Sequence, residues 1–169
     1  TTKVAAVVGE RRNDGSIIVI GIGKHESTGV RKGEIVDATN AGMCVRAALA
    51  EAEEQADTDV YQVYLAMSGG HIRGDVNRGG VPVTNPHHII TQDEIKAVGE
   101  VAKAFNLAPD REILHAIPQH YTIGGQEDVV HPVGMMGESL SMNMLLIHGV
   151  RVRIDNMVNV VHNIPMDVT

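Results

Sequence analysis

The first apolar segment of the chain is short and rich in β-branched residues. Val4 to Val8 form a run that is typical of a central strand and too short for a helix. Residues 11–15 then end in Asp14-Gly15, the signature of a tight hairpin turn, and residues 16–22 supply a second apolar run. The pattern predicts a β-hairpin at the start of the chain.

Helical periodicity follows in residues 39–56. Apolar side chains recur there at helical spacing, with glutamates on the other faces: Val45, Ala48, Leu49, Ala52 and Ala56. Residues 60–67 return to strand character, which Ser68-Gly69-Gly70 ends. We predict the order β-β-β-α-β for residues 1–68 and a domain boundary near Ser68–Gly70.

The second half of the chain repeats strands and helices in a different order. Residues 71–84 are a strand region interrupted by glycines, and Thr91 with Glu94 forms a capping box that begins a helix ending before Pro109. Strands are predicted at 112–123 and 139–149, and a last helix at 150–163. These elements predict a β-α-β-β-α module over residues 69–164, and a chain of mixed α/β (α+β) class.

Composition narrows the functional classes. The chain has 169 residues, 43% hydrophobic residues and a net charge of −7, with only 2% aromatic residues. It therefore lacks the basic surface and stacking platform of a nucleic-acid-binding protein. Cys44 is its one cysteine, and no apolar run approaches the ~20 residues that cross a bilayer. We expect a soluble cytoplasmic protein and, because it begins at Thr1 without Met, a fragment.

The first three residues are the main candidates for chemistry. Thr1, Thr2 and Lys3 lead directly into the predicted hairpin, and their hydroxyls, backbone N–H groups and ammonium can all donate to a nucleotide phosphate. The alternative is a frayed polar terminus. A further hypothesis makes Thr1 an N-terminal nucleophile, with its own amine as base and a lysine such as Lys32 nearby.

The histidines and glycines give weaker signals. There are nine histidines, but His87 and His88 are adjacent and diverge, whereas His115 and His120 lie an odd number of residues apart in a predicted strand. We therefore expect no metal site. The pairs Gly69-Gly70 and Gly79-Gly80 open no helix and lack the residues of a P-loop. A late methionine group fits either strand packing or an adaptable partner surface: Met135, Met136, Met142 and Met144.

Several separated segments together resemble the FtsA family of bacterial cell-division proteins. They are, in order, TTKVAAVVGE, YLAMSGGHIRG, VTNPHHIITQDEI, ILHAIPQHYTIGGQEDVVHPVGMMG and LLIHGVRVRIDNMVNVV. The most specific part combines Ile117-Pro118-Gln119 with Gly125-Gln126 and Pro132-Val133-Gly134-Met135. The resemblance covers nearly the whole chain.

This resemblance implies a fold and a function. Residues 1–68 would begin an actin-like (RNase H-like) subdomain 1A, residues 69–164 would be its inserted 1C (SHS2-type) interaction module, and residues 165–169 would return to 1A. The parent would be an ATP- and Mg²⁺-binding adaptor that polymerises, tethers the FtsZ ring to the cytoplasmic face of the inner membrane, and recruits later division proteins. We expect no catalytic residues here and at most a weak ATPase in the parent.

The chain also departs from the family pattern. The Asp/Glu-Ile-Gly that precedes the threonines in the family is absent, and the second phosphate loop, the adenosine pocket and the C-terminal membrane helix would lie beyond Thr169. Only Thr1, Thr2 and Lys3 are thus carried over as phosphate-binding residues, and His120 and Gly70 differ from the family's usual residues. A pilus-assembly actin-like adaptor and an N-terminal-threonine hydrolase remain the alternatives.

Overall fold

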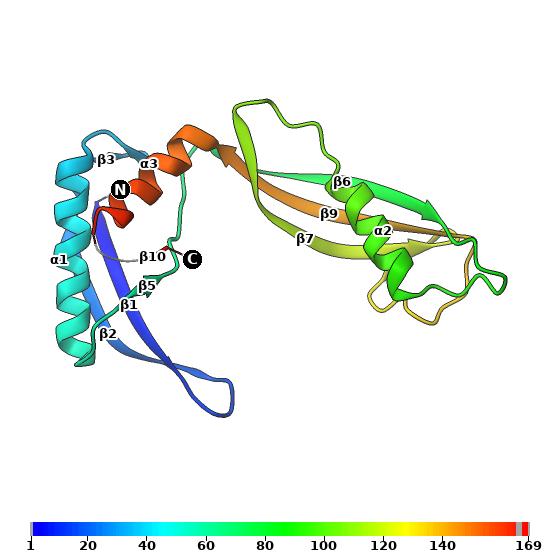
Figure 1. Cartoon of the computed structure of the whole chain (residues 1–169), viewed down its shortest axis with the longest axis horizontal. Coiled ribbons are helices and arrows are strands. Elements are labelled where there is room, and N and C mark those ends of the chain that lie inside the picture. Colours follow the sequence, from blue (N-terminus) through cyan, green and yellow to red (C-terminus); the bar gives the residue numbers. More distant parts are fainter. Residues whose placement is uncertain (1, 165–166, 169) are drawn as a thin grey trace. The chain divides into compact units, whose positions relative to one another are not determined.

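The chain folds into two compact units. A computed structural model describes residues 2–164 and 167–168. Unit 1 comprises residues 1–71 and 151–169, and unit 2 comprises residues 72–150. The chain therefore passes from one unit to the other twice, after His71 and again after Val150. Figure 1 shows the helices and strands of both units.

Unit 1 begins with the hairpin that the Asp-Gly turn predicts. Strand β1 (Lys3–Arg11) pairs antiparallel with β2 (Ile17–Glu26), with a register shift between Val8 and Gly9. At the turn, Gly15 has φ of 85°, and the Asp14 carboxylate accepts a hydrogen bond from the Ser16 N–H at 2.9 Å. A residue without a Cβ suits this left-handed backbone, so the predicted hairpin is confirmed.

Helix α1 (Ala38–Ala56) packs closely on β2, as the alanine-rich stripe predicts. Ala48 and Ala52 are fully buried, and two glycines of β2 lie directly beneath them. A Cβ at Gly23 would stand 1.7 Å from the Ala48 carbonyl oxygen, and one at Gly21 would stand 2.2 Å from that of Ala52. Small residues on both sides therefore set the distance between helix and strand.

The remaining elements of unit 1 are short strands and one helix. Strands β3 (Val30–Arg31) and β4 (Glu34–Ile35) form a small antiparallel pair, and β5 (Gln62–Val63) pairs in parallel with β10 (Asp167–Val168). The strand predicted over 60–67 is thus limited to β5. Helix α3 (Arg151–His162) contributes Val161, which is buried with Leu49 and Ile164.

Helix α3 corrects the predicted domain boundary. We expected this helix inside the 69–164 module, but it packs against α1 and β4 in unit 1, where Arg153 forms an ion pair with Glu34. Residues 165, 166 and 169 of the expected return segment lie outside the described residues. An amphipathic stripe indicates that a helix is covered on one face, but it carries no information about what covers it.

Unit 2 is a four-stranded antiparallel sheet with a helix on one face. The strand order is β6 (Ile72–Pro82), β9 (Ser139–Val150), β7 (Arg111–Ile123) and β8 (Gln126–Val129). Helix α2 (Gln92–Lys103) packs against β6 and β9. Alternate residues of β9 face the helix and are buried: Leu140, Met142, Met144 and Leu146. Strand β8 was not predicted.

The start of α2 and its contact with β6 follow from particular residues. The Thr91 N–H and hydroxyl both donate to the Glu94 carboxylate, and the Thr91 hydroxyl accepts from the Asp93 N–H at 3.3 Å, so the predicted capping box is confirmed. Near the end of α2, a Cβ at Gly79 would lie 2.5 Å from the Ala102 nitrogen. The helix therefore sits directly on the backbone of β6 at Gly79.

Candidate functional site

The structure describes two of the three predicted phosphate-binding residues, Thr2 and Lys3, whereas Thr1 lies outside the described residues. Both side chains are exposed at the start of β1, and the Thr2 carbonyl accepts a hydrogen bond from the Ser27 N–H at 3.1 Å. The Ser27 hydroxyl oxygen is buried and has no hydrogen-bond partner among the described residues. Thr2, Lys3 and Ser27 are thus neighbours along the backbone at one end of the hairpin, and each carries a side-chain group that can donate a hydrogen bond to an anion.

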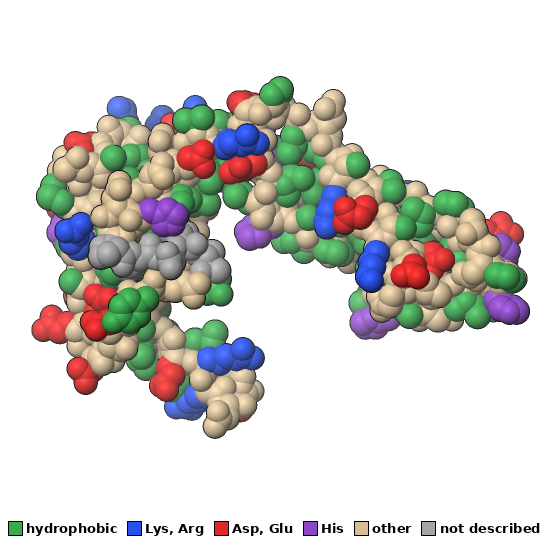
Figure 2. All heavy atoms as spheres, in the orientation of Figure 1, with side chains coloured by type: hydrophobic (Ala, Val, Ile, Leu, Met, Phe, Trp, Pro, Cys, Tyr) green, Lys and Arg blue, Asp and Glu red, His purple; other side chains and the backbone are tan. Residues whose placement is uncertain are grey.

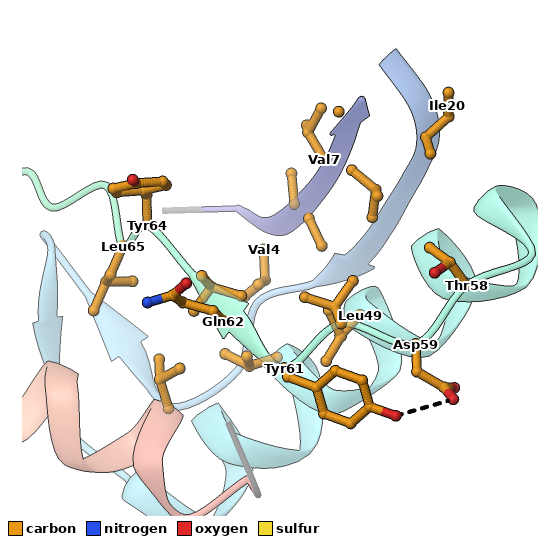
Figure 3. A pocket seen from close by; sticks show the side chains of 18 of the residues that line it. Val4, Val7, Ile20, Leu49, Thr58, Asp59, Tyr61, Gln62, Tyr64 and Leu65 are labelled. Carbon is orange, nitrogen blue, oxygen red and sulfur yellow. Dashed lines mark hydrogen bonds between the residues drawn. The ribbon is translucent and has the colours of Figure 1, made fainter. Parts of the chain in front are cut away.

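An apolar cavity lies elsewhere in unit 1, between β1 and the segment that contains β5 (Figure 3). Its volume is about 740 Å³. It is lined by residues 4–10 and 58–65, together with Ile20, Val45, Leu49 and Val161. Neither Thr2 nor Lys3 lines it, so the cavity and the candidate phosphate-binding residues are separate features.

The lining shows that the cavity faces strand edges. Residues 4–10 and 58–65 contribute without a gap, whereas a strand that presents one face contributes every second residue. The other edge of the hairpin is already satisfied, because the N–H groups of Ile22 and Lys24 donate to Gln55 and Glu51 of α1 at 3.1 and 2.6 Å. A residue of a strand occupies roughly 160 Å³, the product of a strand spacing of about 4.8 Å, a rise of about 3.3 Å and a layer thickness of about 10 Å. The cavity is therefore large enough for a strand of about five residues.

The Cys44 thiol of α1 and the His25 imidazole of β2 influence each other. The Cys44 sulfur lies 3.4 Å from the Thr28 nitrogen and 3.2 Å from its hydroxyl. These bonds from Thr28, and to a lesser degree His25, lower the pKa of the Cys44 thiol, while burial opposes them. The Glu26 carbonyl and Cys44 raise the pKa of His25. Because Cys44 is buried, the same packing that lowers its pKa also restricts access of reagents to it.

A buried histidine links neighbouring strands of unit 2. His148 of β9 has its Nε2 2.7 Å from the Asp75 carboxylate of β6, and its Nδ1 lies 2.8 Å from Arg111 Nε of β7. A guanidinium only donates, so Nδ1 accepts and the ring proton lies on Nε2, where it is donated to Asp75. The network thus joins three neighbouring strands.

Two further features of the described part of the chain bear on its chemistry: its possible metal ligands and a second cleft. Among residues 2–164 and 167–168, no cluster of three or more His, Cys, Asp or Glu side chains is arranged to hold a metal ion. A second cleft in unit 1, of about 280 Å³, is lined by residues 35, 36 and 38 and by Asn156, Asn159, Val160 and Asn163 of α3. It contains no acid, base or nucleophile.

Comparison with known proteins gives matches along most of the chain. Residues 69–148 match the family described as the SHS2 domain inserted in FtsA. Cell division protein FtsA of Escherichia coli K12 is 38% identical over 147 residues, which is 87% of this chain and 34% of that protein. The FtsA proteins of Neisseria meningitidis and Streptococcus pneumoniae are 35% and 33% identical, over 92% and 93% of this chain. The chain spans about a third of the length of these curated relatives.

A solved structure shows the same fold with little sequence identity. The PilM–PilN type IV pilus biogenesis complex contains a chain that matches with a TM-score of 0.62 and 12% identity, over 99% of this chain and 43% of that one. At this identity the match is one of fold. With the family match over residues 69–148, it confirms the predicted mixed α/β class.

Hydropathy gives one further finding. Within the part of the chain that the structure describes, no helix combines the length and the apolar character needed to cross a membrane.

Proposed function

The chain belongs to the FtsA family as a partial sequence, and on that premise we propose that it is the part of a bacterial cell-division adaptor that carries the inserted interaction module. The match between residues 69–148 and the SHS2 domain inserted in FtsA carries the proposal, because this range is almost that of unit 2. A module that folds around its own core and lies between two passages of the chain is suited to present a surface to partners.

The finer roles belong to the longer parent. We propose that the parent polymerises, tethers the FtsZ ring to the membrane at its cytoplasmic face, and recruits later division proteins through unit 2. The membrane contact would come from a helix outside this chain. The likeness to a pilus biogenesis protein is one of fold at 12% identity, so it favours no pilus role.

We also propose that the parent binds ATP with Mg²⁺. Thr1, Thr2 and Lys3 would hold one side of the phosphates, and the Ser27 hydroxyl beside Thr2 adds a donor there. We expect at most weak hydrolysis of this ATP. A few exposed hydrogen bonds contribute about 1–3 kcal/mol, well short of the roughly 8 kcal/mol of micromolar binding.

Titration calorimetry distinguishes this nucleotide site from alternatives. We expect the 169-residue chain to bind Mg·ATP no better than about millimolar, and the parent to bind it strongly and to lose affinity on Lys3→Ala. Micromolar binding by the short chain would place a site elsewhere. A covalent adduct of Thr1 with an inhibitor directed at N-terminal threonines would instead support the hydrolase alternative.

The cavity of unit 1 supports the view that more of the polypeptide completes this unit. We propose that a further strand of the parent lies between β1 and residues 58–65. Three observations support this: the unbroken lining by two strand edges, the volume of about 740 Å³, and relatives about two and a half times as long as this chain.

Depletion of the parent in its own bacterium tests the division role. We expect long cells without septa, rescue by the intact parent, and a fluorescent fusion that gathers at division sites. Deletion of residues 72–150, which removes unit 2 alone, should leave the fusion in the cell but abolish rescue. Normal division with loss of pili would contradict the proposal.

A further inference from the structure

One end of unit 2 carries an exposed apolar surface on two loops that are held together. The loops are residues 83–91, between β6 and α2, and residues 130–138, between β8 and β9. We call them together the tip. They are joined by a bridge between Ile89 and Met136 and by backbone hydrogen bonds of 2.8 to 2.9 Å that join Ile90 to Met135 and Gly134, and His88 to Gly137.

The tip loops are fixed from within by side chains that alternate with the exposed ones. Within the loops Ile90 and Pro132 are buried, Val129 is buried at the end of β8, and Met135 packs against the core of unit 2. The Asn85 side chain donates to the Ile89 carbonyl at 2.7 Å and accepts from the Ile89 N–H at 3.0 Å. A surface held in this way loses little conformational entropy when it binds a partner.

The neighbours of these anchors point outward. Met136 is 70% exposed, Val130 67%, Val133 49% and Ile89 38%. Single exposed apolar residues are common, but aliphatic side chains grouped on ordered loops mark an interaction surface. Met136 is also flexible at its side chain, so it suits a contact that must adapt to a partner. The sequence allowed the methionine group to be either strand packing or an adaptable partner surface. Met142 and Met144 are buried in the core, whereas Met136 is exposed and can contact a partner.

The charges around the tip have one sign. The sequence holds no lysine or arginine from residue 79 to 95 or from 112 to 150, a span that includes both loops. Exposed carboxylates adjoin the tip at Glu127, Asp128 and Glu138, and Glu94 lies 3.5 Å from the Asn85 side chain. In Figure 2 the right-hand end of the molecule, which Figure 1 identifies as the loop end of unit 2, shows hydrophobic, histidine and acidic side chains. We call the carboxylates of Glu94, Glu127, Asp128 and Glu138 the rim of the tip. This rim attracts a basic partner and repels an anionic lipid surface.

We propose that the tip of unit 2 is the docking surface for a partner protein whose contacting segment combines apolar side chains with lysine or arginine. The apolar side chains would cover Ile89, Val133 and Met136, and the basic ones would meet the carboxylates of the rim. This inference rests on the proposed function of unit 2 as an interaction module, and it adds the surface and the chemistry of the partner.

The test is an NMR titration of the intact 169-residue chain. The probe is a short synthetic peptide of alternating leucine and lysine, and the comparison peptides are alternating leucine and glutamate and alternating serine and lysine. We expect the leucine–lysine peptide to shift the resonances of residues 83–91 and 130–138, and the other two to bind at least about tenfold more weakly. Binding should weaken with added salt, because its rim contacts are exposed ion pairs.

Substitutions locate the contact. Met136→Ser with Val133→Ser, and separately Glu127→Lys with Glu138→Lys, should each weaken binding about tenfold or more. Val101→Ser on α2 is the matched control, because Val101 is 45% exposed but lies outside the tip, and it should change nothing. All these positions are exposed, so spectra of the free variants should keep the dispersion of a folded unit 2.

Each other outcome overturns the proposal. Shifts centred outside the tip, equal binding of the leucine–glutamate peptide, or no binding would exclude this surface or this partner chemistry. Tip resonances that move with protein concentration and no peptide would show that a second copy is the occupant. These results are independent of the depletion experiment. If the peptide fails to bind but depletion blocks division, only the proposal of the tip as docking surface is excluded. If the peptide binds but depletion leaves division normal, only the proposed division role is excluded.

Discussion

The two units differ in how far their own residues complete their cores. In unit 2, α2 covers one face of the sheet, and β9 lies between β6 and β7 with a buried residue at every second position. Among the described residues of unit 1, β1 pairs only with β2, and its other edge faces an apolar cavity of about 740 Å³. Unit 2 is thus closed over its core, whereas the described part of unit 1 leaves a strand edge beside an apolar cavity, where we propose a further strand.

Large effects are expected where a helix touches strand backbone. Gly79→Ala in unit 2 would place a Cβ 2.5 Å from the Ala102 nitrogen, so α2 must move off the sheet. We expect a loss of about 2–4 kcal/mol in the free energy of unfolding of unit 2, measured by urea titration. Gly74→Ala on the same strand is the control, because its Cβ would meet only a side-chain methyl of Leu145 at 3.4 Å. Equal losses for both would show that the close contact is not decisive.

The methionines of unit 2 separate core from surface. Met144 is 1% exposed, so Met144→Ala should cost about 2–5 kcal/mol in the free energy of unfolding. Met136→Ala should cost less than about 0.5 kcal/mol, because its side chain is mostly in solvent. Thermal and urea unfolding of both variants check this difference. A large loss from Met136→Ala would mean that the tip belongs to the core and is not free for a partner.

Features of the fold could be predicted from the sequence where the interacting residues are close together in the chain. The hairpin at Asp14-Gly15 and the capping box at Thr91 and Glu94 were predictable because their determinants lie within a few residues of one another. The placement of α3 was not predictable, since it depends on contacts with α1 and β4 more than a hundred residues earlier in the chain. The same holds for the candidate sites: Thr2 and Lys3 could be named, but Ser27 is brought beside them only by the pairing of β1 with β2.

The His148 network is another long-range feature that no local pattern announces. Its partners Asp75 and Arg111 lie 73 and 37 residues away in sequence. His148→Ala should destabilise unit 2 by about 1–3 kcal/mol, because it leaves two charged groups without this partner. Asp75→Asn keeps an acceptor for the Nε2 proton and should cost less. Nitrogen chemical shifts of His148 check the tautomer, and a proton on Nδ1 would contradict the assigned network.

The smallest effect concerns acid stability. Bonds from the Thr91 hydroxyl and N–H lower the pKa of Glu94. A carboxyl whose pKa is lower in the folded state stabilises that state above its ordinary range and loses this contribution as pH falls through the lowered value. Glu94→Gln should therefore flatten the fall in helix α2 stability at acid pH, followed by circular dichroism, while Asp93→Asn, whose carboxylate is outside the box, serves as the control. An unchanged acid profile would remove Glu94 from the cap.

Amide hydrogen exchange, compared between the 169-residue chain and the longer parent, tests most directly whether unit 2 is complete and unit 1 is not. In the short chain we expect slow exchange along β9, which is paired on both sides, and fast exchange at alternate β1 amides, which face the cavity. In the parent those alternate β1 amides should become protected, with β9 unchanged. Uniform protection of β1 in the short chain, or no gain in the parent, would contradict the account.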